Sequence, residues 1–384
     1  MAYGKHSINK QGNAKAKKNP LLKILSVVIF LVLCFALFFY ANTAISVKGI
    51  MQNKGTYQAF DDLQEDTVDV VLLGSSAMSR YFIPSKAYND EGVSSFVIGA
   101  ASTPVIFMDN IMTYVQKTQK PKVFVIELRN VLKGYAAVNE VSVRTTVDNM
   151  KFYKKDRIEM INEALEVMGE HAEIGSYDDE PLDYYLPVIK YHTRLTSTGD
   201  EAITADELML DFPYIKTQGF PCAAVTVTQA AQEAPVFATT SCELDSDIQE
   251  ILDDLIDYCD SIDAQVLFTF SPYVQETYDS EMANAVTDYV QSRGYTCLNF
   301  CSDEMIEELG IDWSTDMYNN HHFNYLGAEK YTNYLTKYLK ENYDLEDHRG
   351  DATYSSWEEG YEIYSNYVAD GIKHVAEGNV ADEE

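Results

Sequence analysis

Two serines follow a short apolar segment early in the chain. Residues 68–73 (VDVVLL) are rich in β-branched side chains and end in Gly74-Ser75-Ser76, which is typical of a buried parallel strand that runs into a turn. A serine hydroxyl at the carboxyl end of such a strand lies near helix N-terminal amides that can stabilise an oxyanion. Serine is also a common helix cap, so this motif alone leaves both the nucleophilic and the structural interpretation open.

A pair of histidines precedes the last long helical segment. Residues 316–328 read DMYNNHHFNYLGA, with His321 and His322 in the middle. A neutral histidine can accept the proton of a serine hydroxyl, and a nearby aspartate can fix its tautomer. Histidine pairs in acidic loops are otherwise often solvated. The combination with the two serines favours nucleophilic chemistry more than either segment does alone.

Together these segments resemble the SGNH/GDSL hydrolase superfamily, in which a Gly-Asp-Ser block ends the first strand and an Asp-x-x-His block precedes the C-terminal helix. Gly74-Ser75-Ser76 matches the first block with Ser75 in place of the aspartate, so the resemblance makes Ser76 the nucleophile. His322 is favoured as the base because His-Phe-Asn-x-x-Gly continues into the helix. The phrases STDMYNNHHFNYLGA and DYYLPVIKYHTRL are similar to a branch of membrane-anchored bacterial cell-surface proteins, which is similar to the D-alanyl transfer protein of lipoteichoic acid synthesis and to alginate-type O-acetyltransferases.

The resemblance also implies an oxyanion hole. Gly99 follows the second expected strand, and its amide would be one donor beside the amide of Ser76. Asn130 follows the third expected strand and would supply a side-chain donor. Arg129 is an accessory residue that would offer a cationic donor at the same place.

The acid of the triad is the point at which this sequence departs from the family. Asn319, not an aspartate, lies three residues before His322. Asp316 lies six residues before it, and we expect it to orient the histidine if the loop bulges. Asn319 or a backbone carbonyl is the alternative, which would leave a Ser–His dyad. Ser75 and Asn324 are further accessory polar residues.

Short apolar segments alternate with amphipathic ones through most of the chain. We expect strands over 68–73, 95–98, 122–127, 265–270 and 295–300, and helices over 104–118, 245–262, 280–293 and 325–341. This alternation predicts βαβ units with a parallel sheet covered on both faces. With the resemblance, the expected class is α/β: a three-layer α/β/α sandwich with a mainly parallel, flavodoxin-like sheet. Residues 131–240 interrupt the pattern as an insertion or lid over the crevice at the strand ends.

The N-terminal region predicts a membrane anchor. Residues 21–40 (LLKILSVVIFLVLCFALFFY) carry one charge and would span about 30 Å as a helix. The lysines of residues 1–20 place that tail in the cytoplasm and the body outside. A cleaved signal peptide and a buried core helix are the alternatives. The expected order is a basic tail (1–20), a transmembrane helix (21–41), a linker (42–66), an SGNH-like domain (67–345) and an acidic C-terminal extension (346–384).

Charge and composition exclude several classes of function. The chain of 384 residues has 29 Lys+Arg and 60 Asp+Glu, which gives a formal net charge of −31. Residues 61–384 hold 21 of the Lys+Arg and all 60 of the Asp+Glu, so their net charge is −39. A basic nucleic-acid binder and a disordered chain are excluded, and neutral or zwitterionic glycans are easier substrates than polyanions. The six cysteines lack zinc-site spacing and predict buried thiols with at most one Cys222–Cys242 bridge. We expect no metal and no cofactor.

The resemblance therefore implies an extracytoplasmic, membrane-anchored serine esterase or O-acyltransferase that acts on acyl esters of cell-surface polysaccharide or cell-wall polymer. Transfer would involve a membrane-bound acyl-donor protein and a glycan acceptor as partners. The competing expectation is a non-catalytic module of the same fold that binds or scaffolds cell-envelope glycan. The lack of an aspartate at position 319 favours this second interpretation.

Overall fold

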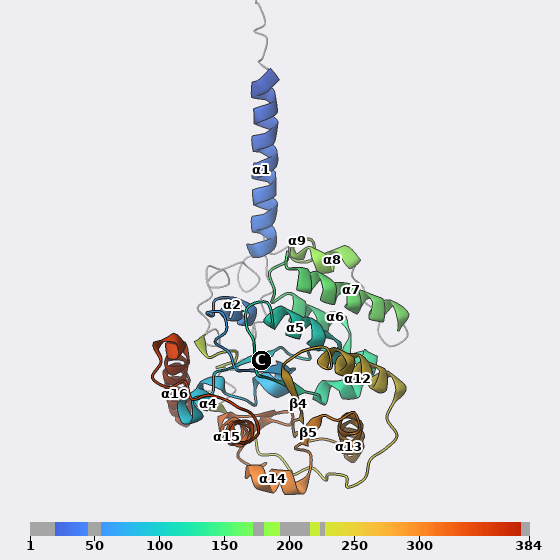
Figure 1. Cartoon of the computed structure of the whole chain (residues 1–384), viewed down its shortest axis with the longest axis vertical. Helices are drawn as coiled ribbons and strands as arrows, with labels where there is room; N and C mark the ends of the chain where they lie inside the picture. The colour runs from blue at the N-terminus through green and yellow to red at the C-terminus, as the bar shows by residue number, and fades with distance from the viewer. Residues whose placement is uncertain (1–19, 45–54, 172–179, 193–215, 223–226, 378–384) are drawn as a thin grey trace, which may run out of the picture.

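The computed structural model describes residues 20–44, 55–171, 180–192, 216–222 and 227–377. An N-terminal helix, α1 (Pro20–Ala44), projects from an α/β body, as Figure 1 shows. The α/β class that the alternating segments predict is confirmed by the parallel sheet of the body.

A five-stranded parallel sheet forms the centre of the body. Its strands are β1 (Val70–Gly74), β2 (Ser95–Gly99), β3 (Val123–Glu127), β4 (Gln265–Phe270) and β5 (Thr296–Asn299). Every residue of β1, β2 and β3 is buried, which explains why the sequence shows continuous apolar runs instead of alternation. All five expected strands are present, with ends within two residues of those predicted.

The strand order is β2-β1-β3-β4-β5. The second strand lies on one side of β1 and the third on the other, so the winding direction of the sheet reverses between β1 and β3. In open parallel sheets, ligands bind in the crevice beyond the carboxyl ends of the strands at such a reversal. Leu73 pairs with Ile126 near these ends, so the turn after β1 and the loop after β3 are neighbours.

The amphipathic segments form the expected helices. They are α5 (Met108–Val115) after the 3-10 turn η2 (Val105–Phe107), α12 (Ser246–Cys259), α13 (Thr277–Ser292) and α15 (Tyr325–Asn342). In α12 the buried residues Ile248, Ile251, Leu252 and Leu255 recur every three or four positions, which turns one apolar face toward the core. The shorter helices are α3 (Ser76–Ser79), α4 (Pro84–Glu91) and α14 (Asp303–Leu309).

The expected insertion between β3 and α12 is largely helical where the structure describes it. It contains η3 (Arg129–Ala137), α6 (Glu140–Val147), α7 (Lys155–Glu170), α8 (Pro181–Tyr185) and α9 (Pro187–Tyr191). The last three lie at the end of the body nearest α1 (Figure 1). Residues 172–179, 193–215 and 223–226 of the predicted insertion lie outside the described residues.

Two observations bear on the N-terminal region. The span Pro20–Asn42 of α1 is long and apolar enough to cross a membrane, and none of its most apolar window is buried against the body, so the buried core helix is ruled out. A candidate membrane span and a signal sequence both fit this helix. Part of the expected linker belongs to the body. It forms α2 (Thr56–Asp61), and Phe60 of this helix packs edge-on against Phe96 with ring centroids 5.2 Å apart.

The C-terminal extension is also part of the body. After the turn η7 (Ala352–Tyr354), helix α16 (Ser355–Ala376) packs against α4. Trp357 is almost fully buried, and its indole N–H donates to the carbonyl of Ser95 in β2 at 2.8 Å. This part of the expected acidic extension is therefore a helix held by core contacts. The acidic residues 378–384 lie outside the described part of the chain.

The cysteines are all free thiols in the structure. Cys222 is buried and Cys242 is half-buried, and no bridge joins them. Burial raises the pKa of Cys222, Cys259 and Cys297 to about 12. These thiols therefore behave as small apolar core residues rather than as nucleophiles.

Candidate active site

Ser76 is the first residue of α3, directly after β1. Gly74 ends the strand, and a Cβ there would lie 2.9 Å from the Cβ atoms of Glu127 and Met78, so the close approach of the turn to β3 requires glycine. The Ser75 hydroxyl accepts a hydrogen bond from the amide of Ala77 at 3.3 Å. Ser75 is thus the cap of the short helix, while the half-buried side chain of Ser76 faces the residues described next.

His322 reaches the same place from the far end of the chain. It opens β7 (His322–Phe323), which pairs antiparallel with β6 (Met317–Asn319). Its Nε2 atom lies 2.8 Å from the Oγ atom of Ser76. The structure thus brings together the two residues that the sequence pointed to as nucleophile and base.

Asn319 contacts the second ring nitrogen of His322. Its Oδ1 atom lies 3.2 Å from Nδ1 of His322 and also accepts the backbone amide of His321 at 2.8 Å. Because the backbone amide of His321 can only donate, the side-chain atom of Asn319 that it contacts is the oxygen. The same oxygen faces Nδ1 of His322, so Nδ1 must carry the ring proton and donate it. In this tautomer Nε2 has a free lone pair and accepts the hydrogen of the Ser76 hydroxyl.

Asp316 is not the group that faces the histidine. Its carboxylate is 1% exposed, lies 2.6 Å from Nζ of Lys330 and accepts the backbone amide of Asp312 at 2.7 Å. The β6–β7 hairpin places Asn319 opposite His322, with a register shift between Met317 and Asn319, and this irregularity does not turn the Asp316 carboxylate toward the histidine. In the structure Asp316 instead fastens the start of the hairpin to α15.

The ionisation of His322 suits a general base. Burial lowers its pKa well below the usual value, and the positive charges of Arg129 and Arg80 lower it further. The imidazole is therefore neutral at pH 7, the form that can accept a proton.

Arg129 ties the loop after β3 to the histidine hairpin. Its Nη1 donates to the carbonyl of His321 at 3.0 Å and to the Tyr81 hydroxyl at 3.2 Å, and its guanidinium lies 4.7 Å from the centre of the Tyr273 ring. The Tyr81 hydroxyl lies 2.8 Å from the carbonyl of Pro272, beyond β4. The same hydroxyl lies 2.9 Å from the carbonyl of His321. Residues that follow β1 and β3 therefore converge on the backbone of His321, and Tyr81 links them to the segment after β4.

Arg80 and Tyr318 are site residues that the sequence analysis missed. Tyr318 stacks on the ring of His322, with centroids 5.4 Å apart and planes inclined by 6°, and the Arg80 guanidinium lies 5.3 Å from the centre of the Tyr318 ring. A spacing signal did exist for Arg80, because it lies four residues after Ser76, about one helical turn. Nothing in the sequence marked Tyr318.

Of the expected oxyanion donors, the Asn130 side chain is occupied elsewhere, whereas Gly99 lies beside the turn that carries Ser76. Both hydrogens of the Asn130 amide are engaged, since Nδ2 donates to the carbonyls of Ser102 (3.0 Å) and Thr103 (2.8 Å). Asn130 thus shapes the loop after β2 and does not offer its side chain to a substrate. Gly99 lies beside the nucleophile turn, where a Cβ would be 3.0 Å from the carbonyl oxygens of Gly74 and Ser75.

Asn324 is a structural cap. Its Oδ1 accepts the amides of Leu326 (2.9 Å) and Gly327 (3.4 Å) at the start of α15, and its Nδ2 donates to the carbonyl of Thr315 at 2.7 Å. Asn324 is completely buried. The residue directly after the hairpin is therefore fixed, which limits how far His322 can move.

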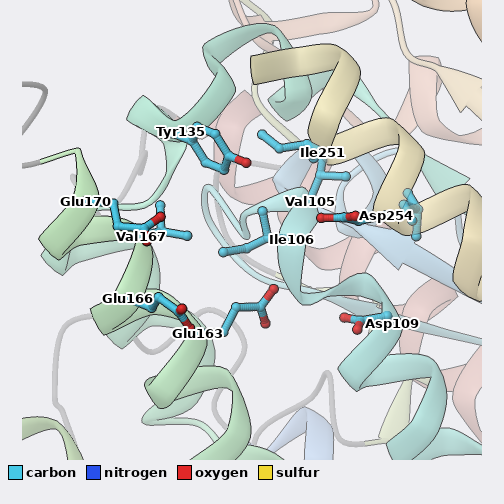
Figure 2. A pocket seen from close by; sticks show the side chains of 11 residues that line it. Val105, Ile106, Asp109, Tyr135, Glu163, Glu166, Val167, Glu170, Ile251 and Asp254 are labelled. Carbon is cyan, nitrogen blue, oxygen red and sulfur yellow. The ribbon is translucent and has the colours of Figure 1, made fainter. Parts of the chain in front are cut away.

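A separate hollow of about 180 Å3 lies between η2, α5, α7 and α12 (Figure 2). It is lined by apolar side chains, by Tyr135 and by five carboxylates, those of Asp109, Glu163, Glu166, Glu170 and Asp254. Burial and the neighbouring charges of Asp109 and Asp254 raise the pKa of Glu163 to about 8. Within the described ranges, no group of three or more His, Cys, Asp or Glu residues is arranged to hold a metal ion.

No family model, curated protein or solved structure matches the chain. The chemistry of the Ser76–His322 site is therefore argued from its own geometry.

Proposed function

We propose that this chain is a membrane-anchored serine enzyme of SGNH type that cleaves or transfers acyl esters of a cell-surface polysaccharide or cell-wall polymer. The observation that carries the proposal is the 2.8 Å contact between Ser76 Oγ and His322 Nε2, made by two residues on separate loops. The strand order supports the accompanying proposal of a three-layer, flavodoxin-like sandwich.

The proposed reaction has two halves. The Ser76 oxygen forms a bond to the acyl carbonyl carbon while its proton moves to Nε2 of His322, and the Asn319 oxygen keeps the proton on Nδ1. The tetrahedral intermediate then expels the alcohol, which takes the proton from His322 and leaves an acyl-serine. Water or a glycan hydroxyl attacks this ester with His322 again as base, which regenerates Ser76.

The charges around the pair support the developing oxyanion. Arg129 and Arg80 both lie close enough to His322 to lower its pKa, so they also stabilise negative charge that forms near Ser76. The backbone amides of Ser76 and Gly99 are the proposed direct donors. Since Asn319 is uncharged, it stabilises the imidazolium less than an aspartate would, and we propose a slow enzyme.

The remaining parts of the proposal follow from α1 and the resemblance. The basic tail lies in the cytoplasm, α1 crosses the cytoplasmic membrane once, and the body lies outside. The acyl group comes from a membrane-bound donor protein when the reaction is transfer. The residues named here need no metal and no organic cofactor for this chemistry.

One observation favours a different function. Asn319 occupies the place of the triad acid, as it would in a module that has lost catalysis and only binds or scaffolds cell-envelope glycan. The two functions are separated by measuring both hydrolysis and glycan binding on the same full-length variants. For an enzyme, Ser76→Ala removes hydrolysis of a chromogenic acetyl ester and keeps glycan binding.

The matched control is Ser75→Ala, which removes a buried helix cap and leaves Ser76 Oγ in place. We expect this variant to be less stable by about 1 kcal/mol and to keep hydrolysis. Equal hydrolysis by wild type and Ser76→Ala would contradict the enzyme and leave the binding module.

A further inference from the structure

The end of the body nearest α1 carries exposed apolar side chains. Val141, Tyr153, Ile158 and Leu182 are 68%, 50%, 38% and 54% exposed. They come from α6, from the loop before α7, from α7 itself and from α8, and α7 and α8 lie at this end in Figure 1. We call these four residues the α1-proximal surface.

The last turns of α1 are packed onto this end of the body. Asn42 is 3% exposed, and its Oδ1 accepts the backbone amide of Val188 in α9 at 3.1 Å. The ring of Phe39 stacks on that of Tyr153 and lies edge-on to that of Phe152, with ring centroids 5.2 Å apart in both pairs. These contacts fix Tyr153 at the level of the last apolar turns of α1.

The depth of Tyr153 relative to a bilayer follows from the position at which α1 leaves the bilayer. The apolar span of α1 runs to Asn42, and its final turns carry Phe38, Phe39 and Tyr40. Aromatic side chains concentrate where a spanning helix crosses the headgroup region. If Phe39 lies in that region, its neighbour Tyr153 lies there too, and so does the surface around it.

The charge of the same region differs from that of the rest of the body. Residues 141–160 hold five Lys+Arg and three Asp+Glu, and the ion-pair partners Glu140 and Asp61 bring the balance to zero. Residues 61–384 together carry −39. A bilayer with anionic lipids therefore repels this end of the body less than it repels the rest.

We infer that the α1-proximal surface lies in the headgroup region of the membrane that α1 spans, so that the body rests on the lipid in one fixed orientation. This inference rests on the proposed membrane anchoring of α1. Its occupant is the lipid bilayer itself. A soluble protein partner would leave these side chains in water when the purified chain is placed in a membrane.

The test measures quenching of tryptophan fluorescence by lipids that are brominated in the upper part of their acyl chains. The full-length protein is placed in nanodiscs of phosphatidylcholine and phosphatidylglycerol, and single substitutions introduce the probes. Tyr153→Trp and Leu182→Trp probe the surface. Leu31→Trp probes the middle of α1 and is measured with lipids brominated near the ends of their acyl chains. Tyr278→Trp is the matched control, because Tyr278 is 56% exposed on α13, far from α1 in Figure 1. The wild type, whose Trp313 and Trp357 are both buried, gives the baseline.

We expect loss of the added fluorescence in Tyr153→Trp and Leu182→Trp, because both probes then lie at the membrane interface, and no loss in Tyr278→Trp. If Leu31→Trp is quenched while Tyr153→Trp and Leu182→Trp behave like Tyr278→Trp, α1 spans the membrane and the surface contact is overturned. If Leu31→Trp is not quenched, the anchoring itself fails and the inference falls with it. The Ser76 chemistry is independent of both outcomes.

Discussion

The Arg129 guanidinium donates to the backbone carbonyl of His321, the residue directly before the base His322, at 3.0 Å. This contact joins the loop after β3 to the hairpin that carries the base. It holds the hairpin near Ser76 and at the same time brings a positive charge close to the imidazole, which contributes to the lowered pKa of His322. One arginine thereby helps to position the proposed base and adds to the effect of burial in lowering its pKa.

Removal of that charge is expected to change the pH profile. In the wild type the acid limb of kcat/KM for ester hydrolysis lies well below pH 6.5, because His322 becomes protonated only there. In Arg129→Met the loss of a nearby positive charge raises the pKa of His322 and moves the acid limb to higher pH by roughly 0.5 to 1 unit. Arg129→Lys keeps the positive charge, so the acid limb of its kcat/KM profile should stay at the pH of the wild type. An acid limb that stays in place in Arg129→Met, with the fold intact by circular dichroism, would contradict the electrostatic role.

Substitution of Asn319 by aspartate is expected to increase activity. The added carboxylate would accept the Nδ1 proton of His322 and stabilise the imidazolium formed when Ser76 attacks. We predict that Asn319→Asp raises kcat by about 10-fold or more, whereas Asn319→Ala lowers it. The comparison is made with one chromogenic ester under identical conditions. A well-folded Asn319→Asp variant with unchanged or lower kcat would show that Asn319 does not act as the orienting group.

The pair of Asp316 and Lys330 is expected to act on stability and not on catalysis. Lys330→Met leaves the buried carboxylate of Asp316 without its cation, at a cost of about 1 to 2 kcal/mol, since Lys330 is partly exposed to water. Thermal melting should detect this loss. Below the melting temperature the ester-hydrolysis rate should remain within a factor of about two of the wild type. A large fall in kcat without a fall in melting temperature would instead place Asp316 in the catalytic machinery.

Glu163 is expected to make the folded state less stable as the pH rises. Its pKa is raised from 4.5 to about 8 by burial and by the charges of Asp109, Asp254 and Glu166. Between these two values the folded chain holds a proton that the unfolded chain has lost, so stability decreases with rising pH until the group is ionised in both states. Glu163→Gln removes this penalty and should stabilise the protein by about 1 to 2 kcal/mol at pH 9, with little effect at pH 4 to 5.

Denaturant unfolding of the wild type and of Glu163→Gln at pH 5 and pH 9 measures the effect. Glu170→Gln removes a carboxylate at the exposed end of the same helix and is the matched control. An equal response of both variants to pH would refute the special environment of Glu163.

The sequence was sufficient to predict the sheet and to find Ser76 and His322. Buried parallel strands leave continuous apolar runs that are visible in the sequence, and β4 matches its expected bounds at both ends. Residues 131–240 are expected to form an insertion or lid, and the helices α7, α8 and α9 of this segment lie toward α1. The lid over the strand ends stays a prediction, because the sequence carries no local pattern that shows which part of the body an inserted segment contacts.

The side-chain partners within the site were harder to predict. Asp316 and Asn130 are of the types that a triad and an oxyanion hole use, but partners distant in the sequence claim their polar atoms: Lys330 for Asp316, and the carbonyls of Ser102 and Thr103 for Asn130. The positions of Arg80 and Tyr318 next to His322 depend on the convergence of α3 with the β6–β7 hairpin. Such competition between partners is decided only by the complete fold.

The most direct test of the account is covalent labelling of the full-length protein with a fluorophosphonate, followed by peptide mass spectrometry to locate the adduct. A serine becomes reactive toward this probe when a neighbouring base accepts its proton. We predict an adduct on Ser76 in the wild type and in Ser75→Ala, and none in Ser76→Ala or His322→Ala. The absence of an adduct on well-folded wild type, or an adduct on Ser76 that persists in His322→Ala, would contradict an activated Ser76–His322 pair.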